Sequence, residues 1–128
     1  MSGPARAGLF LYAKDLPRLA EFYESVAGFA RLHESAELIV LQSPDIQLVV
    51  HAIPEDIAQN IVIASPPERR ANTALKFFFS VPSLLRAREV AAGLGGEVFS
   101  ENWPGPGFVV CNAMDPEGNV FQLRESAA

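Results

Sequence analysis

The stretch DPEGNVFQL, from Asp115 to Leu123, decides the fold because it joins a tight turn directly to a short strand. Proline fixes φ and glycine tolerates a positive φ, so Asp-Pro-Glu-Gly has the composition of a turn. The residues that follow alternate as in a strand, with Phe121 and Leu123 on one face and Gln122 on the other. The pattern places Gln122 where a strand that faces a cavity presents its polar side chain.

The chain has the composition of one globular domain, with 128 residues, 49% of them hydrophobic and 20% charged. Its net charge of −5 argues against a nucleic-acid partner, because phosphates attract a basic surface. No apolar run approaches the roughly 20 residues that cross a bilayer, and MSGPARAG lacks the apolar core of a secretory signal, so we expect no membrane partner. Cys111 is the single cysteine, which fits the cytoplasmic location that we predict.

Two segments of the chain share one pattern: LYAKDLPRLAEFYESVAGF from Leu11 and FSVPSLLRAREVAAGLGGE from Phe79. Each begins as an aromatic strand, continues with Asp15 or Ser83 as a helix N-cap, and ends an amphipathic helix at glycine. At a constant offset of 68 residues, four identities align: Leu16 with Leu84, Arg18 with Arg86, Glu21 with Glu89, and Gly28 with Gly96.

Three strand candidates follow each helix, namely ARLHES, AELIVLQS and IQLVVHAI, then GEVFSE, GFVVCNAM and VFQLRE. The segment Ile46-Gln47-Leu48 matches Phe121-Gln122-Leu123. The sequence therefore predicts an α+β fold of two βαβββ modules in a single domain over 1–128. Module one spans about 7–53, a linker about 54–73, and module two about 74–126. In the linker, PEDIAQN indicates a helical turn and IVIAS an extended piece.

These segments resemble the vicinal oxygen chelate superfamily, which has the glyoxalase/bleomycin-resistance/dioxygenase fold. The resemblance rests on the first repeat, the glycine pair after the second helix, Trp103 with Gly105 and Gly107, and DPEGNVFQL. It implies that the two modules form a curved mixed sheet around a cup-shaped cavity. It also implies a homodimer, in which some members of the superfamily exchange modules.

The resemblance further implies four metal-ligand positions on the first and last strands of the modules, which fall on Gly8, Gln47, Lys76 and Gln122. Glycine has no donor, lysine must first lose a proton at a pKa near 10.4, and a glutamine carbonyl is a weak neutral donor. We therefore predict no metal ion and no other cofactor. The alternative is an improvised site around His51, with Tyr12 or Glu125 nearby.

Strand alternation also predicts which side chains share the cavity. We predict these ligand-binding residues from alternation: Phe10, Tyr12, Gln47, His51, Lys76, Phe78 and Gln122. Val49, Ser80 and Arg124 share their face, and the opposite face packs beneath the helices through Leu9, Leu11, Leu48, Val50, Phe77, Phe79, Phe121 and Leu123. The resemblance implies that Trp103 also lines the cavity. Trp103 lies in NWPGPGF, which reads as a Pro/Gly-rich loop.

Aromatic walls with few polar groups are typical of a small-molecule pocket, and we favour a metal-independent binder that sequesters a toxic compound or antibiotic, as bleomycin-resistance proteins do. One alternative is a lyase, isomerase or dioxygenase that uses unconventional metal ligands, or Lys76 or His51 as a base. Another is a non-catalytic accessory domain, in which Phe10, Phe78 and Trp103 fill the cavity. The sequence assigns no catalytic residue.

Overall fold

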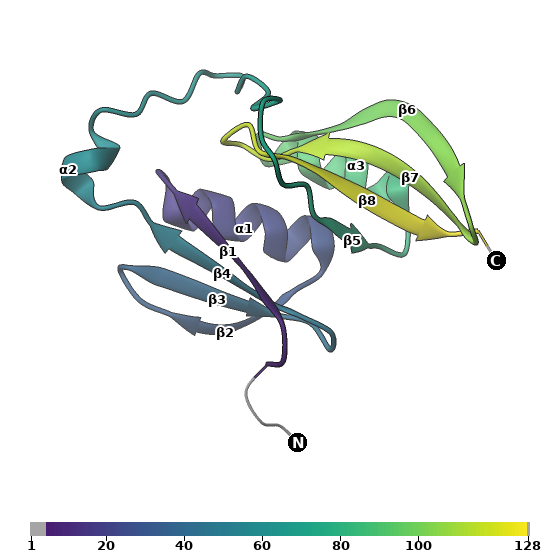
Figure 1. Ribbon diagram of the computed structural model, residues 1–128, viewed down its shortest axis with the longest axis horizontal. Coiled ribbons are helices and arrows are strands. Elements are labelled where there is room, and N and C mark those ends of the chain that lie inside the picture. Colours follow the sequence, from purple (N-terminus) through teal and green to yellow (C-terminus); the bar gives the residue numbers. More distant parts are fainter. Residues whose placement is uncertain (1–4, 128) are drawn as a thin grey trace.

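A computed structural model of the chain, described here for residues 5–127, has the predicted α+β architecture (Figure 1). The first module contains β1 (Gly8–Ala13), α1 (Leu16–Ala27), β2 (Ala30–Glu34), β3 (Leu38–Gln42) and β4 (Gln47–Ala52). The short helix α2 (Glu55–Ala58) follows, as expected from PEDIAQN, and the second module contains β5 (Phe78–Ser80), α3 (Leu84–Gly93), β6 (Glu97–Gly105), β7 (Phe108–Met114) and β8 (Val120–Ser126). The prediction of two βαβββ modules is confirmed. No helix among the described residues is both long and apolar enough to cross a membrane.

The two long helices begin at the predicted caps. Asp15 accepts a hydrogen bond from the Arg18 amide at 3.2 Å, and Ser83 accepts one from the Arg86 amide at 3.1 Å. Each cap satisfies an amide that has no partner within the first helical turn. Helix α1 ends at Gly28, whose φ of 76° is easily reached only without a Cβ atom.

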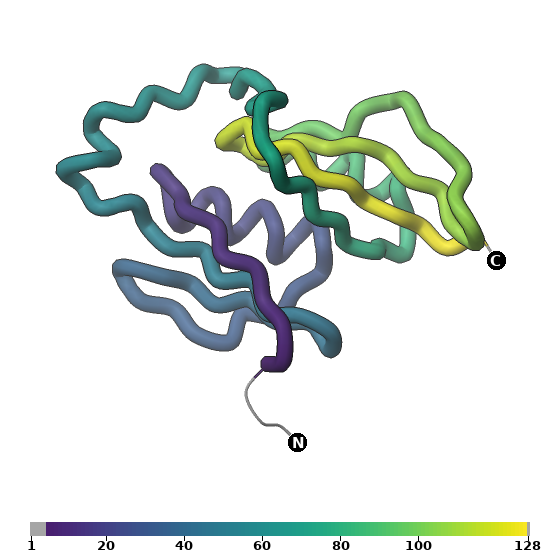
Figure 2. The backbone as a smooth tube through the Cα atoms, in the orientation of Figure 1, coloured from purple at the N-terminus to yellow at the C-terminus, as the bar shows by residue number. Residues whose placement is uncertain are grey.

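The strands form two four-stranded sheets, ordered β1-β4-β3-β2 and β5-β8-β7-β6, which do not close into a barrel. In each sheet the first and last strands of the module are parallel, and the other pairs are antiparallel. Both long helices lie behind the strands in Figure 1, so each sheet has a helix-covered face and an uncovered face. Figure 2 shows the linker arching from α2 to the second module.

The predicted assignment of side chains to faces agrees with the observed burial. Leu48, Val50, Phe121 and Leu123 are fully buried beneath the helices. The uncovered faces, here called the open face, carry these side chains: Phe10, Tyr12, Val49 and His51 on the first sheet, and Phe78, Ser80, Gln122 and Arg124 on the second. On the open face Phe10, Tyr12 and Phe78 are 51%, 59% and 49% exposed. The period of two residues in a strand was therefore read in the correct register.

The predicted equivalence of Gln47 and Gln122 is wrong by two residues. In the parallel ladders, Phe10 lies opposite Val49, whereas its counterpart Phe78 lies opposite Gln122. The structural counterpart of Gln122 is therefore Val49. The match of two Gln-Leu pairs suggested the wrong alignment because Gln47 is the first residue of β4, whereas Gln122 is the third residue of β8. A shift of two residues keeps the same face, so alternation alone did not reveal the error.

The segment NWPGPGF is not the predicted loop, because Asn102 to Gly105 complete strand β6 and only Pro106 and Gly107 form the turn. Pro104 is tolerated there because β6 is the outermost strand of its sheet, where a missing amide donor breaks no inner ladder. The predicted extended piece IVIAS, residues 61–65, belongs to no strand.

The aromatic core joins the two modules. Tyr23 of α1 packs against Phe77, Phe79 and Phe121 of the second sheet, with ring centroids 6.1, 6.1 and 5.3 Å away. Phe22 also meets Phe121 edge-on at 6.0 Å. Aromatic pairs at these distances are favourable beyond their buried area, so the first helix of one module completes the core of the other.

The turn of DPEGNVFQL anchors this core with buried hydrogen bonds. Tyr23 donates its hydroxyl to Asp115 Oδ2 at 2.6 Å, and Asp115 Oδ1 accepts from the Glu117 and Asn119 amides. Burial raises the pKa of the Tyr23 hydroxyl well above its ordinary value, and the nearby Asp115 carboxylate raises it further. Burial also raises the pKa of Asp115, against the opposing effect of its hydrogen bonds. Tyr23 therefore remains a donor at neutral pH.

Glu117 makes the second connection between the modules. Its carboxylate accepts the Lys14 amide at 2.9 Å and the Asp15 amide at 2.8 Å, directly before α1. The side chain is nearly fully buried, and backbone amides satisfy both of its oxygens. The turn therefore fixes where α1 begins relative to the second sheet.

We expect Tyr23→Phe to lower the free energy of unfolding by about 1–3 kcal/mol, because it leaves a buried Asp115 oxygen with one donor fewer. Urea denaturation measures the change. Tyr12→Phe is the matched control, since the exposed Tyr12 ring should give a change within about 0.5 kcal/mol. Equal stabilities of the two variants would contradict the role given to this hydrogen bond.

Candidate functional site

An aromatic cluster occupies the open face of the first sheet. Phe10 and Tyr12 of β1 have ring centroids 5.3 Å apart, and His51 of β4 lies 5.8 Å from each. The His51 Nδ1 atom is 2.8 Å from the Ala52 carbonyl oxygen. Because a carbonyl only accepts, Nδ1 carries the proton in this contact, and Nε2 of the neutral ring is left as an acceptor.

The open face of the second sheet combines aromatic rings with two cations. The Arg124 guanidinium carbon is 3.6 Å from the Phe78 ring centroid and 4.3 Å from that of Phe108. Lys76 lies just before β5, and its Nζ reaches Asn112 Oδ1 of β7 at 3.5 Å, a long contact for a hydrogen bond. Two cations therefore share one surface with aromatic rings.

The ladder register places these side chains in two rows across the sheet. Phe78, Gln122 and Asn112 form one row over β5, β8 and β7. The next row runs through Ser80, Arg124, Val110 and Trp103, which brings Trp103 onto the same surface at its outer strand. Trp103 therefore faces the same side as Arg124, but it lies on the edge strand β6, two strands away from β8.

The predicted ligand-binding residues form two groups. Phe10, Tyr12 and His51 lie together on the first sheet, whereas Lys76, Phe78 and Gln122 lie together on the second. Gln47 stands apart at the start of β4, where its amide donates to Gln42 at 3.2 Å. Glu125, considered beside His51 in the sequence, instead accepts the Leu84 amide at the start of α3 at 2.7 Å.

The rings that would fill the cavity of a non-catalytic accessory domain do not pack together. Among the described residues, no ring contact joins Phe10, Phe78 and Trp103, and these rings are 51%, 49% and 38% exposed. The arrangement therefore differs from that of a packed core between the modules.

Sequence reasoning placed Arg124 on the correct face but assigned it no role. The sequence did contain the feature that places it there, because Arg124 follows Gln122 by two residues in the same strand and therefore shares its face. The contact of Phe108 with Arg124 could not be predicted from the sequence, because the two residues lie on different strands, β7 and β8. The polar partner of Lys76, Asn112, also lies on another strand.

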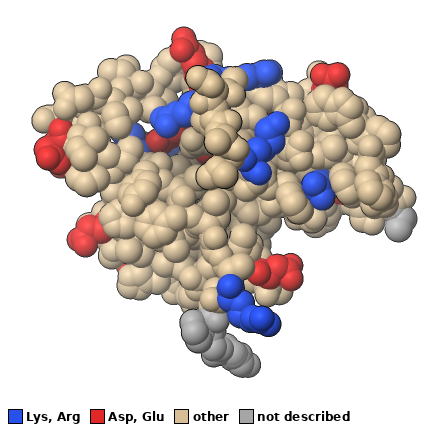
Figure 3. All heavy atoms as spheres, viewed as in Figure 1, with Lys and Arg blue, Asp and Glu red and all other residues tan. Residues whose placement is uncertain are grey.

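Charge is unevenly distributed on this side of the molecule. In the space-filling view several Lys and Arg atoms lie near the middle, whereas most Asp and Glu atoms lie toward the rim (Figure 3). Within residues 5–127, ion pairs are found only between Arg31 and the carboxylates of Glu24 and Glu34. Lys76 and Arg124 thus have no carboxylate partner within the described part of the chain.

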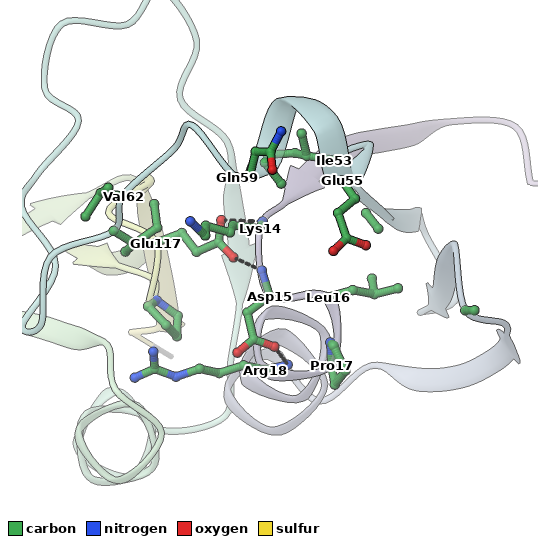
Figure 4. A pocket seen from close by; sticks show the side chains of 15 residues that line it. Lys14, Asp15, Leu16, Pro17, Arg18, Ile53, Glu55, Gln59, Val62 and Glu117 are labelled. Carbon is green, nitrogen blue, oxygen red and sulfur yellow. Dashed lines mark hydrogen bonds between the residues drawn. The ribbon is translucent and has the colours of Figure 1, made fainter.

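The two larger hollows described for residues 5–127 lie beside the junction of the modules. One, of about 370 Å³, lies at the seam between them and is lined by Leu9, Phe10, Leu11, Arg70, Thr73, Ala74, Leu75, Phe77, Asn119 and Val120. The other, of about 730 Å³, lies beneath the linker near the start of α1. Figure 4 shows Glu117 in its wall, directed at the backbone of Lys14 and Asp15. The seam hollow shares Phe10 with the open face, whereas the linker hollow shares none of its residues.

The residues at the ligand positions of the superfamily do not fit a divalent cation. Gly8 offers no donor, and a Cβ atom there would lie only 3.1 Å from the Gln47 carbonyl oxygen. In the ladders the first-module counterpart of Gln122 is Val49 rather than Gln47, and valine offers no donor. Within residues 5–127, no group of three or more His, Cys, Asp or Glu side chains is arranged to hold a metal ion.

A family model described as a glyoxalase-like domain matches residues 8–124. The chain therefore belongs to the glyoxalase-like domain family, and the resemblance seen in DPEGNVFQL is confirmed. A comparison with curated proteins finds no match.

Several solved structures share the fold. A glyoxalase/bleomycin resistance protein/dioxygenase family enzyme from Burkholderia phytofirmans PsJN has a TM-score of 0.71 at 17% identity, over 95% of this chain and 98% of that chain. A glyoxalase-related enzyme from Fulvimarina pelagi gives 0.66 at 17%, over 97% and 89%. The genomically encoded fosfomycin resistance protein FosX from Listeria monocytogenes gives 0.65 at 16%, over 100% and 94%. At these identities the likeness concerns the fold alone.

We expect the purified protein to retain far less than one equivalent of zinc, manganese, iron or nickel after incubation with excess metal and dialysis, because the donor set is too weak. Elemental analysis by mass spectrometry measures the content. His51→Ala should bind the same residual amount as the unsubstituted chain. One tightly held equivalent, removed by a chelator, would show that the donor argument is wrong.

Proposed function

We propose that this chain binds a small organic molecule on its open face without the help of a metal ion. The observation that carries the proposal is the surface itself, in which half-exposed rings of Phe10, Tyr12 and Phe78 stand beside a few polar groups. Ligand sites typically have this makeup, with apolar walls and sparse orienting donors. The poor donors at the superfamily's ligand positions support a role that needs no metal.

The separation of the rings favours binding over a purely structural role. Rings that served only to fill a core would be buried against one another, whereas these remain available to a ligand. One structural neighbour is a fosfomycin resistance protein. By analogy of fold, we propose that this chain protects against a toxic compound or antibiotic by binding it unchanged, and that it does so in the cytoplasm.

We also propose a homodimer in which a second copy covers part of the open face and turns it into a cup. The support is that Phe10, Tyr12 and Phe78 remain about half exposed in the single chain. Exposed aromatic surface of this kind is typical of sites where another molecule binds.

We expect a screen of small aromatic compounds to find ligands that raise the melting temperature by about 5 °C at tenfold the dissociation constant. Tyr12→Ala and Phe10→Ala should each weaken binding about tenfold, because each removes apolar contact area. Leu85→Ala is the control, since Leu85 is 66% exposed on α3, away from the open face. Unchanged affinity in both Tyr12→Ala and Phe10→Ala would exclude the first sheet's part of the open face as the site.

We expect light scattering to give a mass near 28 kDa, about twice the 13.9 kDa of the chain. Tyr12→Asp should shift the protein toward the monomer, because it places a charge in the covered apolar surface. Glu37→Asp, a conservative change at an exposed residue, serves as the control. A monomer at every concentration would contradict the proposed assembly.

A further inference from the structure

We propose that the open face of the second sheet is an anion site, at which Lys76, Arg124 and Gln122 bind the carboxylate of a small organic acid with an apolar body. This inference rests on the proposed binding function and names the chemical class of its ligand. In this proposal, cationic side chains supply the attraction for an anionic group that a bound metal ion would otherwise supply.

The Arg124 guanidinium is held in place but has unused donors. Phe78 and Phe108 lie 3.6 and 4.3 Å from its central carbon, so the rings limit the movement of the side chain. Its Nε is buried and has no hydrogen-bond partner among the described residues. Leaving a buried charged donor unsatisfied is costly, and no described residue satisfies the Nε donor of this guanidinium group.

The two cations converge on one row of side chains. The row consists of Phe78, Gln122 and Asn112 on neighbouring strands. Arg124 stacks over Phe78 at one end of the row, and Lys76 contacts Asn112 at the other end. Gln122 is the middle residue of that row. Neighbouring strands lie about 4.8 Å apart, so a carboxylate above Gln122 is about one strand from each end and within reach of both long side chains.

Within residues 5–127, no carboxylate forms an ion pair with Lys76 or Arg124. The ion pairs within residues 5–127 all involve Arg31, on the other module. Asn112, the polar contact of Lys76, is neutral, and its 3.5 Å distance leaves the ammonium group free to turn toward a ligand. A carboxylate accepts hydrogen bonds from arginine and lysine in the strong, charge-assisted form.

The surroundings also define the rest of the ligand. Phe78 and Phe108 flank Arg124, and Trp103 lies in the same cross-strand row as Arg124. These rings suit a flat, apolar body of modest size, which stacks on aromatic faces. An aryl carboxylate meets both requirements, whereas an amine of the same shape is repelled by the two cations.

The test uses benzoate, its neutral analogue benzamide and its cationic analogue benzylamine as probes. Two-dimensional amide NMR titrations report both affinity and the location of binding. We expect benzoate to bind at least tenfold more tightly than benzamide, with shifts centred on β5 and β8, and benzylamine not to bind. The benzoate affinity should fall as salt is added, because charges on an exposed surface are screened.

Two substitutions identify the groups responsible. Lys76→Gln and Arg124→Gln should each weaken benzoate binding about tenfold and leave benzamide unaffected. Arg86→Gln removes the same charge from an exposed position on α3 and should change neither affinity. Because Arg124 packs between two rings, Arg124→Lys keeps the charge if the glutamine variant does not fold, and it should retain part of the preference for benzoate.

The outcomes separate the two proposals. Equal binding of benzoate and benzamide, or benzoate binding that survives both Lys76→Gln and Arg124→Lys without loss, would overturn the anion site while leaving small-molecule binding intact. If no neutral or charged aromatic probe shifts the resonances of the open face, the proposed binding function fails, and the anion site fails with it.

Discussion

The buried hydrogen bond from Tyr23 to Asp115 is the constraint on which the arrangement of the two modules depends. It joins the first helix to the turn before the last strand, at a sequence separation of 92 residues. Glu117 reinforces it by holding the amides that precede α1. Gly96 permits the close approach of the second module to α1, because a Cβ atom there would collide with the Phe22 ring. The turn that identifies the family is thus a structural connection between its modules.

With the helices fixed on one side, the opposite faces of both sheets are left uncovered. Strand alternation then puts every second side chain on that surface. On the first sheet this surface is aromatic, with the imidazole of His51 beside Phe10 and Tyr12. On the second sheet this surface carries Lys76 and Arg124. Two side chains thus supply the positive charge that a bound divalent cation would otherwise bring. The proposed recognition of an anionic ligand rests on these two cations.

Much of this could be predicted from the sequence because the determinants are local. The caps Asp15 and Ser83 lie next to the helices that they begin, and the alternation of the strands fixes which residues face the helices. Failures occurred where a distant contact decided the outcome. The equivalence of Gln47 and Gln122 depended on ladder register, which pairs Phe10 with Val49 but Phe78 with Gln122. The segment around Pro104 became a strand because it lies at a sheet edge.

The sequence by itself determined the two modules, the family and the residues of each strand face, since periodicity and capping act over a few residues. Only the tertiary structure decided how those faces are used. It showed that the rings of Phe10, Phe78 and Trp103 stay apart, that Phe108 joins Phe78 around Arg124, and that no carboxylate pairs with that arginine within the described residues. These facts depend on the packing of separate strands, because side chains far apart in the chain meet only after the sheets have formed.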